Sequence, residues 1–230
     1  MLSQYQMAGA AAQDLAVARN KVLRNTYLLL ALSMVPTVLG AVLGVASNFA
    51  LLPGSPILSV LLFLGIAWGL MFGIQRTRNS GMGVVLLLAF TFFMGLMLSG
   101  MLRAALGFAN GGSLIAMAAG GTGVIFMGMA TMATVSKRDF SFLGKFLFIG
   151  LLVVIVASLA NIFFQLPALA LTISAGAVLL FSAFILFDIN RIVTGGEDNY
   201  IMATLSVYLD IYNLFVHLLN LLMALAGERD

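Results

Sequence analysis

Seven long apolar segments constrain this chain more than any other feature of its sequence. Each is close to the roughly 20 residues that an α-helix needs to cross the hydrocarbon core of a bilayer. The predicted spans are residues 27–47, 56–74, 81–102, 112–134, 142–164, 168–190 and 201–225. The segments are apolar all round and longer than the alternating strands of about ten residues that build membrane β-barrels. The chain is therefore predicted to be all-α, a polytopic membrane bundle of seven transmembrane helices.

The composition argues against a soluble domain and against several classes of function. Of the 230 residues, 62% are hydrophobic and 8% are charged, whereas a soluble domain carries about 25% charged residues. The cations are too few and too scattered for a nucleic-acid partner, so the expected partner is the lipid bilayer. The chain has no cysteine, and it contains no nucleotide-binding loop or zinc-protease motif. We expect no enzymatic activity and no cofactor.

Lysine and arginine are concentrated in alternate connecting segments. With the N-terminus inside, nine of these residues lie on the inner side and two on the outer side. The inner group is Arg19, Lys21, Arg24, Arg76, Arg78, Lys137, Arg138, Lys145 and Arg191, and the outer group is Arg103 and Arg229. The positive-inside rule then predicts a cytoplasmic N-terminus.

This orientation divides the chain into a cytoplasmic tail, residues 1–25, and a transmembrane domain, residues 26–230. Seven full spans place the C-terminus outside, whereas a re-entrant last segment places both ends inside. A first span without a cleavable leader, in a chain without disulfides, fits a bacterial inner membrane or an internal membrane of a eukaryote.

Small residues recur every four positions in the first two predicted spans. Gly40 and Gly44 do so in the first, and Gly65, Gly69 and Gly73 in the second. Small residues at this spacing let helices approach closely in lipid. Both stripes are therefore predicted to be tight helix–helix contacts.

Two aspartates, Asp188 and Asp210, lie within the last two predicted spans. A carboxylate at membrane depth is costly and usually faces the interior of a bundle or a watery cavity. The short connection makes these two spans antiparallel neighbours, so the two acids are able to meet, share a proton and titrate as a pair. The alternative is that each acid bonds separately to neighbouring polar groups and only fixes the packing.

The last span carries a polar stripe. Asp210, Asn213, His217 and Asn220 lie on one helical face. This face should point into protein, which predicts that the seventh helix is central. His217 is the only histidine, and it is interpreted as a hydrogen-bonding residue, with metal binding or proton transfer as alternatives. The Gly-x-Gly-Asp element of intramembrane aspartyl proteases is missing around Asp210.

Three motifs resemble the bacterial Bax inhibitor family, also called the transmembrane Bax-inhibitor-motif family. Residues 136–144 (SKRDFSFLG) resemble its Thr-Lys-Arg-Asp-Leu-Ser loop, the pair Phe187-Asp188 resembles its aromatic-Asp element, and residues 208–215 (YLDIYNLF) resemble its last-helix motif. Residues 21–27, 160–169 and 195–201 are similar to the YccA branch of the family.

The resemblance implies seven helices with the last one at the centre, and two candidate activities. One is a pH-sensitive calcium leak, in which Asp188 and Asp210 form the sensor and contact the permeant calcium ion transiently. In this activity an arginine of the second helix latches the acids, and Arg76 and Arg78 are the candidates. The other is that of a modulator and substrate of the membrane protease FtsH, engaged through residues 1–25.

Overall fold

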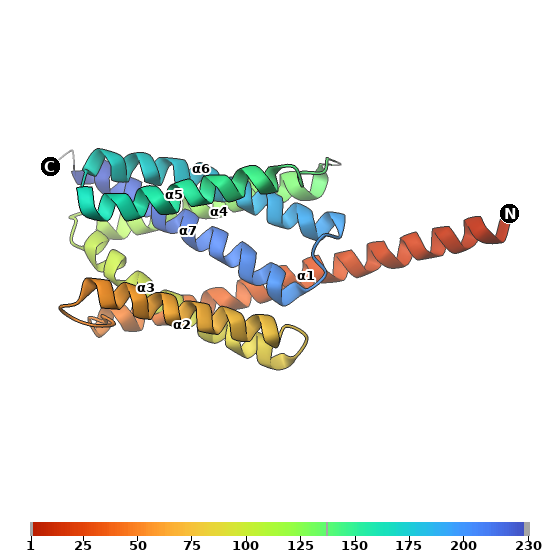
Figure 1. Cartoon of the computed structure of the whole chain (residues 1–230), viewed down its shortest axis with the longest axis horizontal. Coiled ribbons are helices and arrows are strands. Elements are labelled where there is room, and N and C mark those ends of the chain that lie inside the picture. Colours follow the sequence, from red (N-terminus) through yellow and green to blue (C-terminus); the bar gives the residue numbers. More distant parts are fainter. Residues whose placement is uncertain (1, 137, 228–230) are drawn as a thin grey trace.

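The computed structural model describes residues 2–136 and 138–227 of the chain, which form seven helices (Figure 1). Side chains are described for residues 17–55, 57–136 and 138–227. Lys137 and Arg229, which the sequence placed on opposite sides of the membrane, lie outside the described residues. The helices are α1 (Leu2–Ala46), α2 (Pro56–Arg76), α3 (Gly81–Leu106), α4 (Gly111–Val135), α5 (Leu143–Phe164), α6 (Pro167–Thr194) and α7 (Tyr200–Gly227).

All seven helices contain a segment long and apolar enough to cross a membrane, which confirms the predicted fold class. Their ends follow local sequence signals. α2 and α6 begin at prolines, whose missing N–H is not needed in the first turn. α6 ends at Gly195, which has a φ of 86°, a conformation that glycine adopts without strain.

α1 is longer than the predicted first span. The helix runs without a break from Leu2 to Ala46, so residue 25, the predicted end of the tail, lies inside it. The part suited to the membrane is Val17–Ala46. The N-terminal part of α1 projects from one end of the bundle (Figure 1).

The bundle consists of two groups of three helices with α7 between them (Figure 1). In one group α3 packs against α1 and α2, and in the other α6 packs against α4 and α5. α7 contacts α1, α2, α3, α4 and α6, whereas α5 contacts α6 alone. The central position of the seventh helix is therefore confirmed, with α5 as the one helix that does not reach it.

The contact between α1 and α3 depends on glycine. A Cβ on Gly40 would overlap the carbonyl oxygen of Phe92, and a Cβ on Gly95 would overlap that of Thr37. A Cβ on Gly44 would lie 2.6 Å from the Cβ of Ser99. The prediction of a tight contact is therefore confirmed for the stripe in α1.

The stripe in α2 behaves differently, and the prediction of a tight contact is wrong for Gly65 and Gly69. A Cβ on Gly65 or Gly69 would meet no atom within 4 Å, and only Gly73 has a close neighbour, at 3.1 Å in Leu86. α2 turns Gly65 and Gly69 away from α3, so the same spacing occurs on a face that no described part of another helix covers.

Hydroxyl groups connect α7 to the α1–α3 group. The Tyr208 hydroxyl lies 2.9 Å from Oγ1 of Thr37 and 3.4 Å from the carbonyl oxygen of Thr91. One turn further along α7, the Tyr212 hydroxyl donates to the carbonyl oxygen of Met94 at 3.2 Å. These bonds satisfy polar groups that lipid cannot solvate.

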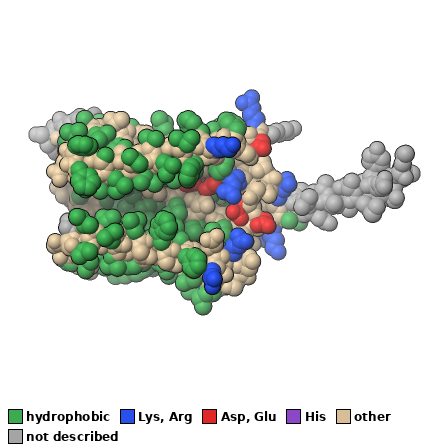
Figure 2. Space-filling model, viewed as in Figure 1, with side chains coloured by type: hydrophobic (Ala, Val, Ile, Leu, Met, Phe, Trp, Pro, Cys, Tyr) green, Lys and Arg blue, Asp and Glu red, His purple; other side chains and the backbone are tan. Residues whose placement is uncertain are grey.

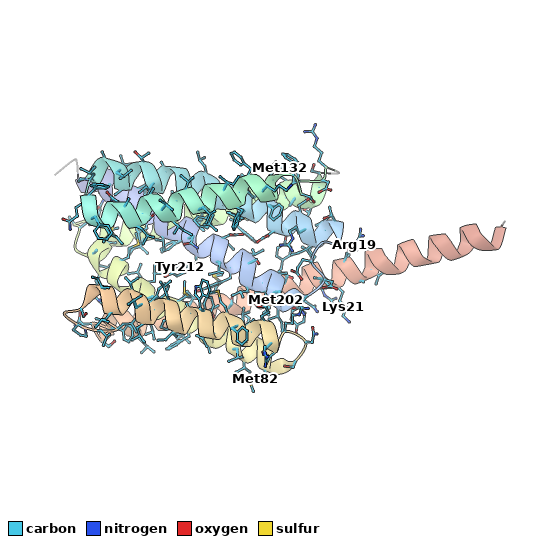
Figure 3. All side chains as sticks on the ribbon, in the orientation of Figure 1. Arg19, Lys21, Met82, Met132, Met202 and Tyr212 are labelled. Carbon is cyan, nitrogen blue, oxygen red and sulfur yellow. The ribbon has the colours of Figure 1, made fainter. Side chains whose placement is uncertain are left out.

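Charge is concentrated at one end of the bundle, called the basic end below. Figure 2 shows most described Lys, Arg, Asp and Glu side chains at the end from which α1 projects, and Figure 3 labels Arg19 and Lys21 there. At the opposite end, Arg103 donates to the carbonyl oxygens of Gly44 at 2.8 Å and Phe49 at 3.1 Å, which satisfies groups at the end of α1.

Candidate acid-pair site

Asp188 and Asp210 meet in the interior of the bundle, on facing sides of α6 and α7. Their carboxyl groups lie close enough to interact directly. Two ionised carboxylates that face each other away from water repel, so the pair favours a state that retains one proton. Asp210 is 6% exposed, and its Oδ2 has no hydrogen-bond partner among the described residues. The pair thus has an acceptor atom that the surrounding protein leaves unused.

Arg191 holds the other side of Asp188. Its Nη1 lies 3.6 Å from Oδ1 of Asp188, and its Nη2 lies 3.7 Å from Oε2 of Glu197 in the α6–α7 loop. The guanidinium also lies over the ring of Phe187, 5.7 Å from its centre. Arg191 therefore connects the acid pair to the loop that leads into α7.

Sequence reasoning used Arg191 only to orient the chain and missed this contact. The signal was present, because Asp188 and Arg191 are three residues apart in a predicted helix and so share a face. Glu197 carried no comparable signal, since its position depends on how the loop folds back toward α6.

Neither Arg76 nor Arg78 forms an ion pair with another described residue. Both are exposed, and the guanidinium of Arg76 lies 5.5 Å from the ring centre of Phe72 on its own helix. Arg78 bonds to the α6–α7 loop through its main chain, since its carbonyl oxygen accepts from Nδ2 of Asn199 at 3.0 Å. Their latch role stays a prediction, and the arginine beside the acids in this structure is Arg191.

The rest of the polar stripe on α7 divides into two parts. Asn213 turns back to its own helix and donates to the carbonyl oxygen of Leu209 at 2.8 Å. Further along, Nδ1 of His217 lies 3.4 Å from Oγ of Ser174, and Nδ2 of Asn220 donates to the same oxygen at 2.8 Å. The stripe thus contacts α6 at two levels. One is the acid pair, and the other is the cluster of Ser174, His217 and Asn220. Asn213 belongs to neither.

Two asparagines that sequence reasoning did not single out hold the loops around the site. Asn190 accepts from the backbone N–H of Phe140 at 2.9 Å and donates to the carbonyl oxygen of Arg138 at 3.2 Å. Oδ1 of Asn199 accepts from backbone N–H groups in the first turn of α7, which is the role of a helix N-cap. These side chains fix three connections, α2–α3, α4–α5 and α6–α7, close to the acids.

The oxygen atoms of the site suit a hard cation, but they are few. Carboxylate oxygens are preferred ligands of Ca²⁺, which takes six to eight oxygen ligands in a stable protein site. Within residues 2–136 and 138–227, no three His, Asp or Glu side chains are grouped so as to hold a metal ion.

The fold and the site together define a seven-helix membrane protein with a paired carboxyl group in its interior. Comparison with known sequences identifies the family. The family model for the "Inhibitor of apoptosis-promoting Bax1" matches residues 19–227. The chain belongs to the Bax inhibitor family.

Among its relatives is the Escherichia coli K12 protein named "Modulator of FtsH protease YccA", which is 44% identical over 206 residues, covering 90% of this chain and 91% of that protein. An uncharacterized Pseudomonas aeruginosa protein is 42% identical over 227 residues, covering 99% and 98% of the two chains. A Vibrio cholerae protein named "Uncharacterized membrane protein" is 44% identical over 203 residues, covering 88% and 89%. The descriptions of the family and of YccA, an inhibitor and a modulator, name no catalysed reaction.

Proposed function

We propose that this chain is a proton-responsive cation leak of a bacterial inner membrane, with its N-terminus in the cytoplasm and calcium as the permeant ion. The observation that carries the proposal is the close approach of two largely buried carboxyl groups, those of Asp188 and Asp210, at the junction of α6 and α7. A pair of this kind has two states, one with a shared proton and one without it.

The loss of the shared proton changes the force between the two helices. With the proton, the carboxyl groups attract each other and hold α7 against α6. Without it, two negative charges face each other where water screens them poorly, so α7 is pushed away from α6. A gate needs two arrangements separated by a few kcal/mol, and the ionisation of one buried group is enough to bias them.

Arg191 sets the balance of this gate. Among the described side chains it is the cation that pairs with one of the two acids, and it is shared between Asp188 and Glu197. When both aspartates ionise, the attraction between Arg191 and Asp188 competes with that of Glu197. The α6–α7 loop, and with it the start of α7, then responds to the charge of the pair.

The test is calcium flux into dye-loaded proteoliposomes, measured across the mildly acidic to neutral range. Wild type is compared with Asp188→Asn, Asp210→Asn and Arg191→Gln. Asp139→Asn is the matched control, because Asp139 is a fully exposed aspartate of the α4–α5 loop at the same end of the bundle. We expect the first three substitutions to move or abolish the pH midpoint of flux, and the control to leave it unchanged.

Two outcomes would contradict the leak. One is wild-type flux equal to that of empty liposomes at every pH. The other is a pH midpoint that is the same in wild type and in both aspartate variants. In either case the acid pair is a packing element, and the second candidate function becomes the leading one.

The second candidate is modulation of a membrane protease, with this chain also a substrate. It is favoured by the 44% identity to the protein named as a modulator of FtsH protease. The projecting N-terminal part of α1 (Figure 1) offers a segment that a protease in the same membrane can reach. In this proposal residues 1–25 bind FtsH, and the packed bundle resists extraction.

Deletion of residues 2–16 separates the two functions. The deletion retains Arg19, whose guanidinium lies against Gly195 in the α6–α7 loop, so the surroundings of the acid pair remain intact. We expect loss of co-purification with FtsH and slower degradation, with calcium flux unchanged. Undiminished binding of FtsH to the shortened chain would exclude residues 2–16 as the binding element.

A further inference from the structure

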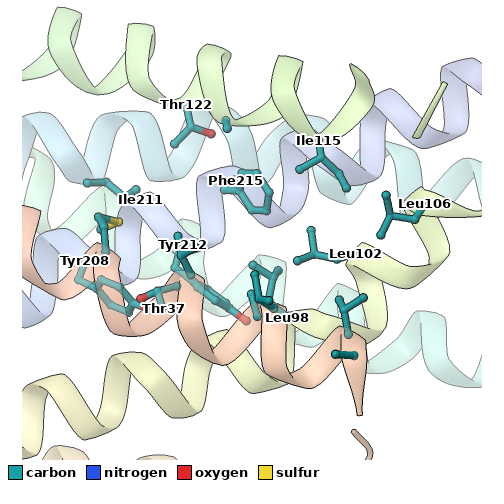
Figure 4. A pocket seen from close by; sticks show the side chains of 17 residues that line it. Thr37, Leu98, Leu102, Leu106, Ile115, Thr122, Tyr208, Ile211, Tyr212 and Phe215 are labelled. Atoms are coloured by element: carbon teal, nitrogen blue, oxygen red, sulfur yellow. Dashed lines mark hydrogen bonds between the residues drawn. The ribbon is translucent and has the colours of Figure 1, made fainter. Parts of the chain in front are cut away.

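A groove runs along the side of the bundle between α1 and α4, whose backbones stay apart and whose Tyr27 and Phe126 rings meet edge to face at one level. Two cavities lie in it, of about 630 Å³ and 710 Å³. Met34, Ala119 and Ile211 line both of them, so the cavities are successive sections of one groove. Figure 4 shows the first section, with α1 and α3 on one side, α4 on the other and α7 behind them.

The groove is as long as the membrane core is thick. Its lining residues on α1 run from Tyr27 to Ala46, a rise of about 28 Å at 1.5 Å per residue. The hydrocarbon core of a bilayer is about 30 Å thick. Because α1 and α4 both qualify as membrane spans, the groove opens sideways toward lipid along its length.

The groove offers almost no polar group to an occupant. Most of its lining is aliphatic. Of the hydroxyls in the first section, those of Thr37 and Thr122 donate to carbonyl oxygens of their own helices. Those of Tyr208 and Tyr212 bond to α1 and α3. An occupant must therefore be apolar along its length.

The dimensions favour a thin occupant over a helix. A helix with side chains is about 10 Å across, so a 28 Å length occupies about 2,200 Å³. This is more than the two cavities hold together. A single hydrocarbon chain is thinner than a helix and needs less of this space, whereas a partner helix has to lie across the mouth.

A cation lies at the basic end of the groove. Arg24, Ala31, Val38 and Val45 are spaced by seven residues and share one face of α1, and the last three line the groove. Arg24 is exposed, and it forms no ion pair with any side chain that the structure describes. An arginine in this position suits the phosphate of a lipid whose chain lies below it.

We propose that this groove binds the acyl chain of an anionic phospholipid, with the lipid phosphate against Arg24. The lipid fills the space between α1 and α4 and contacts the central helix through Ile211. The site lies on the side of α7 that carries Tyr208 and Tyr212, and it does not depend on the proposed leak.

Tryptophan quenching by brominated lipids tests the proposal. The chain has one tryptophan, Trp68 on α2, which is 71% exposed and reports on bulk lipid. A second full-length protein, Trp68→Phe with Phe126→Trp, carries its only tryptophan in the groove wall. Each is reconstituted into phosphatidylcholine vesicles that contain a minor fraction of brominated phosphatidylglycerol or brominated phosphatidylcholine.

We expect half-maximal quenching of the groove reporter at about a five-fold lower membrane fraction of the brominated anionic lipid than of the brominated neutral lipid. This ratio corresponds to the affinity that one basic residue near the surface adds for an anionic lipid. Trp68 should show no preference. When Arg24→Gln is added to the groove reporter, the two lipids should quench it at equal membrane fractions. The matched control is Lys145→Gln, which removes an exposed cation of the same end on α5, a helix that contacts only α6.

A second measurement needs no reporter. Native mass spectrometry of wild type should detect one retained anionic phospholipid, and Arg24→Gln should lose it while Lys145→Gln keeps it. The proposal is overturned if the groove reporter shows no headgroup preference, if Arg24→Gln leaves that preference unchanged, or if wild type retains no lipid. It is also overturned if cysteines placed at Ala31 and Ala119 cross-link to a second protein chain, because a partner then covers the groove.

Discussion

Replacement of Gly95 by alanine tests whether backbone contact between α1 and α3 stabilises the bundle. The added Cβ would overlap the carbonyl oxygen of Thr37 and lie 3.0 Å from the backbone nitrogen of Ala41. Optimal contacts between heavy atoms lie at about 3.5–4.0 Å, so the two helices must separate by roughly half an ångström or more. Neither neighbour is the end of a flexible side chain, so the helices themselves must move.

The expected cost follows from the penalty for inserting a methyl group into a packed interior. Overpacking typically costs about 1–3 kcal/mol. Gly69→Ala is the matched control, because its Cβ would meet nothing within 4 Å. There alanine should stabilise the helix by about 0.5–1 kcal/mol through its higher helix propensity. The same propensity gain applies at Gly95 and cancels, so the two variants should differ by the overpacking cost, about 2 kcal/mol, which is roughly a 30-fold difference in the unfolding equilibrium.

Reversible unfolding in mixed micelles, in which the fraction of denaturing detergent is raised and helicity is followed by circular dichroism, measures this difference. Gly95→Ala should unfold at a lower detergent fraction than wild type, and Gly69→Ala at an equal or higher one. Equal stability of the two variants would refute the reasoning, because it would mean that the α1–α3 contact yields without cost. Destabilisation by Gly69→Ala would instead show that the face of α2 is covered in the micelle.

Three further predictions concern single polar groups. Arg103→Gln should destabilise the protein by about 1–2 kcal/mol in the same assay, because its two bonds to carbonyl oxygens at the end of α1 are lost; an unchanged midpoint would contradict this. Tyr208→Phe should cost about 0.6–1 kcal/mol, since its hydroxyl bonds to α1 and α3 disappear, and a larger loss would indicate a role beyond these bonds. The Ser141 hydroxyl and backbone N–H hold the pKa of Asp139 below its usual range, so this contact stabilises the fold above the unfolded-state pKa and is lost as the pH falls through the folded one. Ser141→Ala should raise the pKa of Asp139 in an NMR titration of its carboxyl carbon, and an unmoved titration would exclude the serine as the cause.

Much of the fold was predictable because lipid imposes a simple rule on sequence. Every span must be a long apolar helix, so hydropathy alone gave six of the seven helices to within a few residues. α1 was the exception, since nothing in the polar residues before Tyr27 marks the point at which a helix begins. The central position of α7 was predictable from its polar stripe, because those side chains have no acceptable place in lipid.

Contacts between helices were less predictable. The spacing of residues shows which of them share a face of a helix, but not which other helix packs against that face. The glycine spacings in α1 and α2 are alike, yet Gly95 of α3 completes the contact for Gly40, and no described residue does so for Gly69. At the acid site, the short α6–α7 loop made a meeting of Asp188 and Asp210 foreseeable. Arg191 pairs with both Asp188 and Glu197 because of the path that this loop takes, and the sequence pattern does not predict that path.

The continuity of α1 has a mechanical consequence. A pull on its N-terminus is transmitted along a rigid rod that passes directly into the α1–α3 contact. This load runs parallel to the contact, so the close approaches at Gly40, Gly44 and Gly95 must slide together in shear. A load perpendicular to the contact would instead peel them apart one at a time, which needs far less force. The projecting helix is thus the easiest part of the molecule to grip and, along its own axis, among the hardest to pull out.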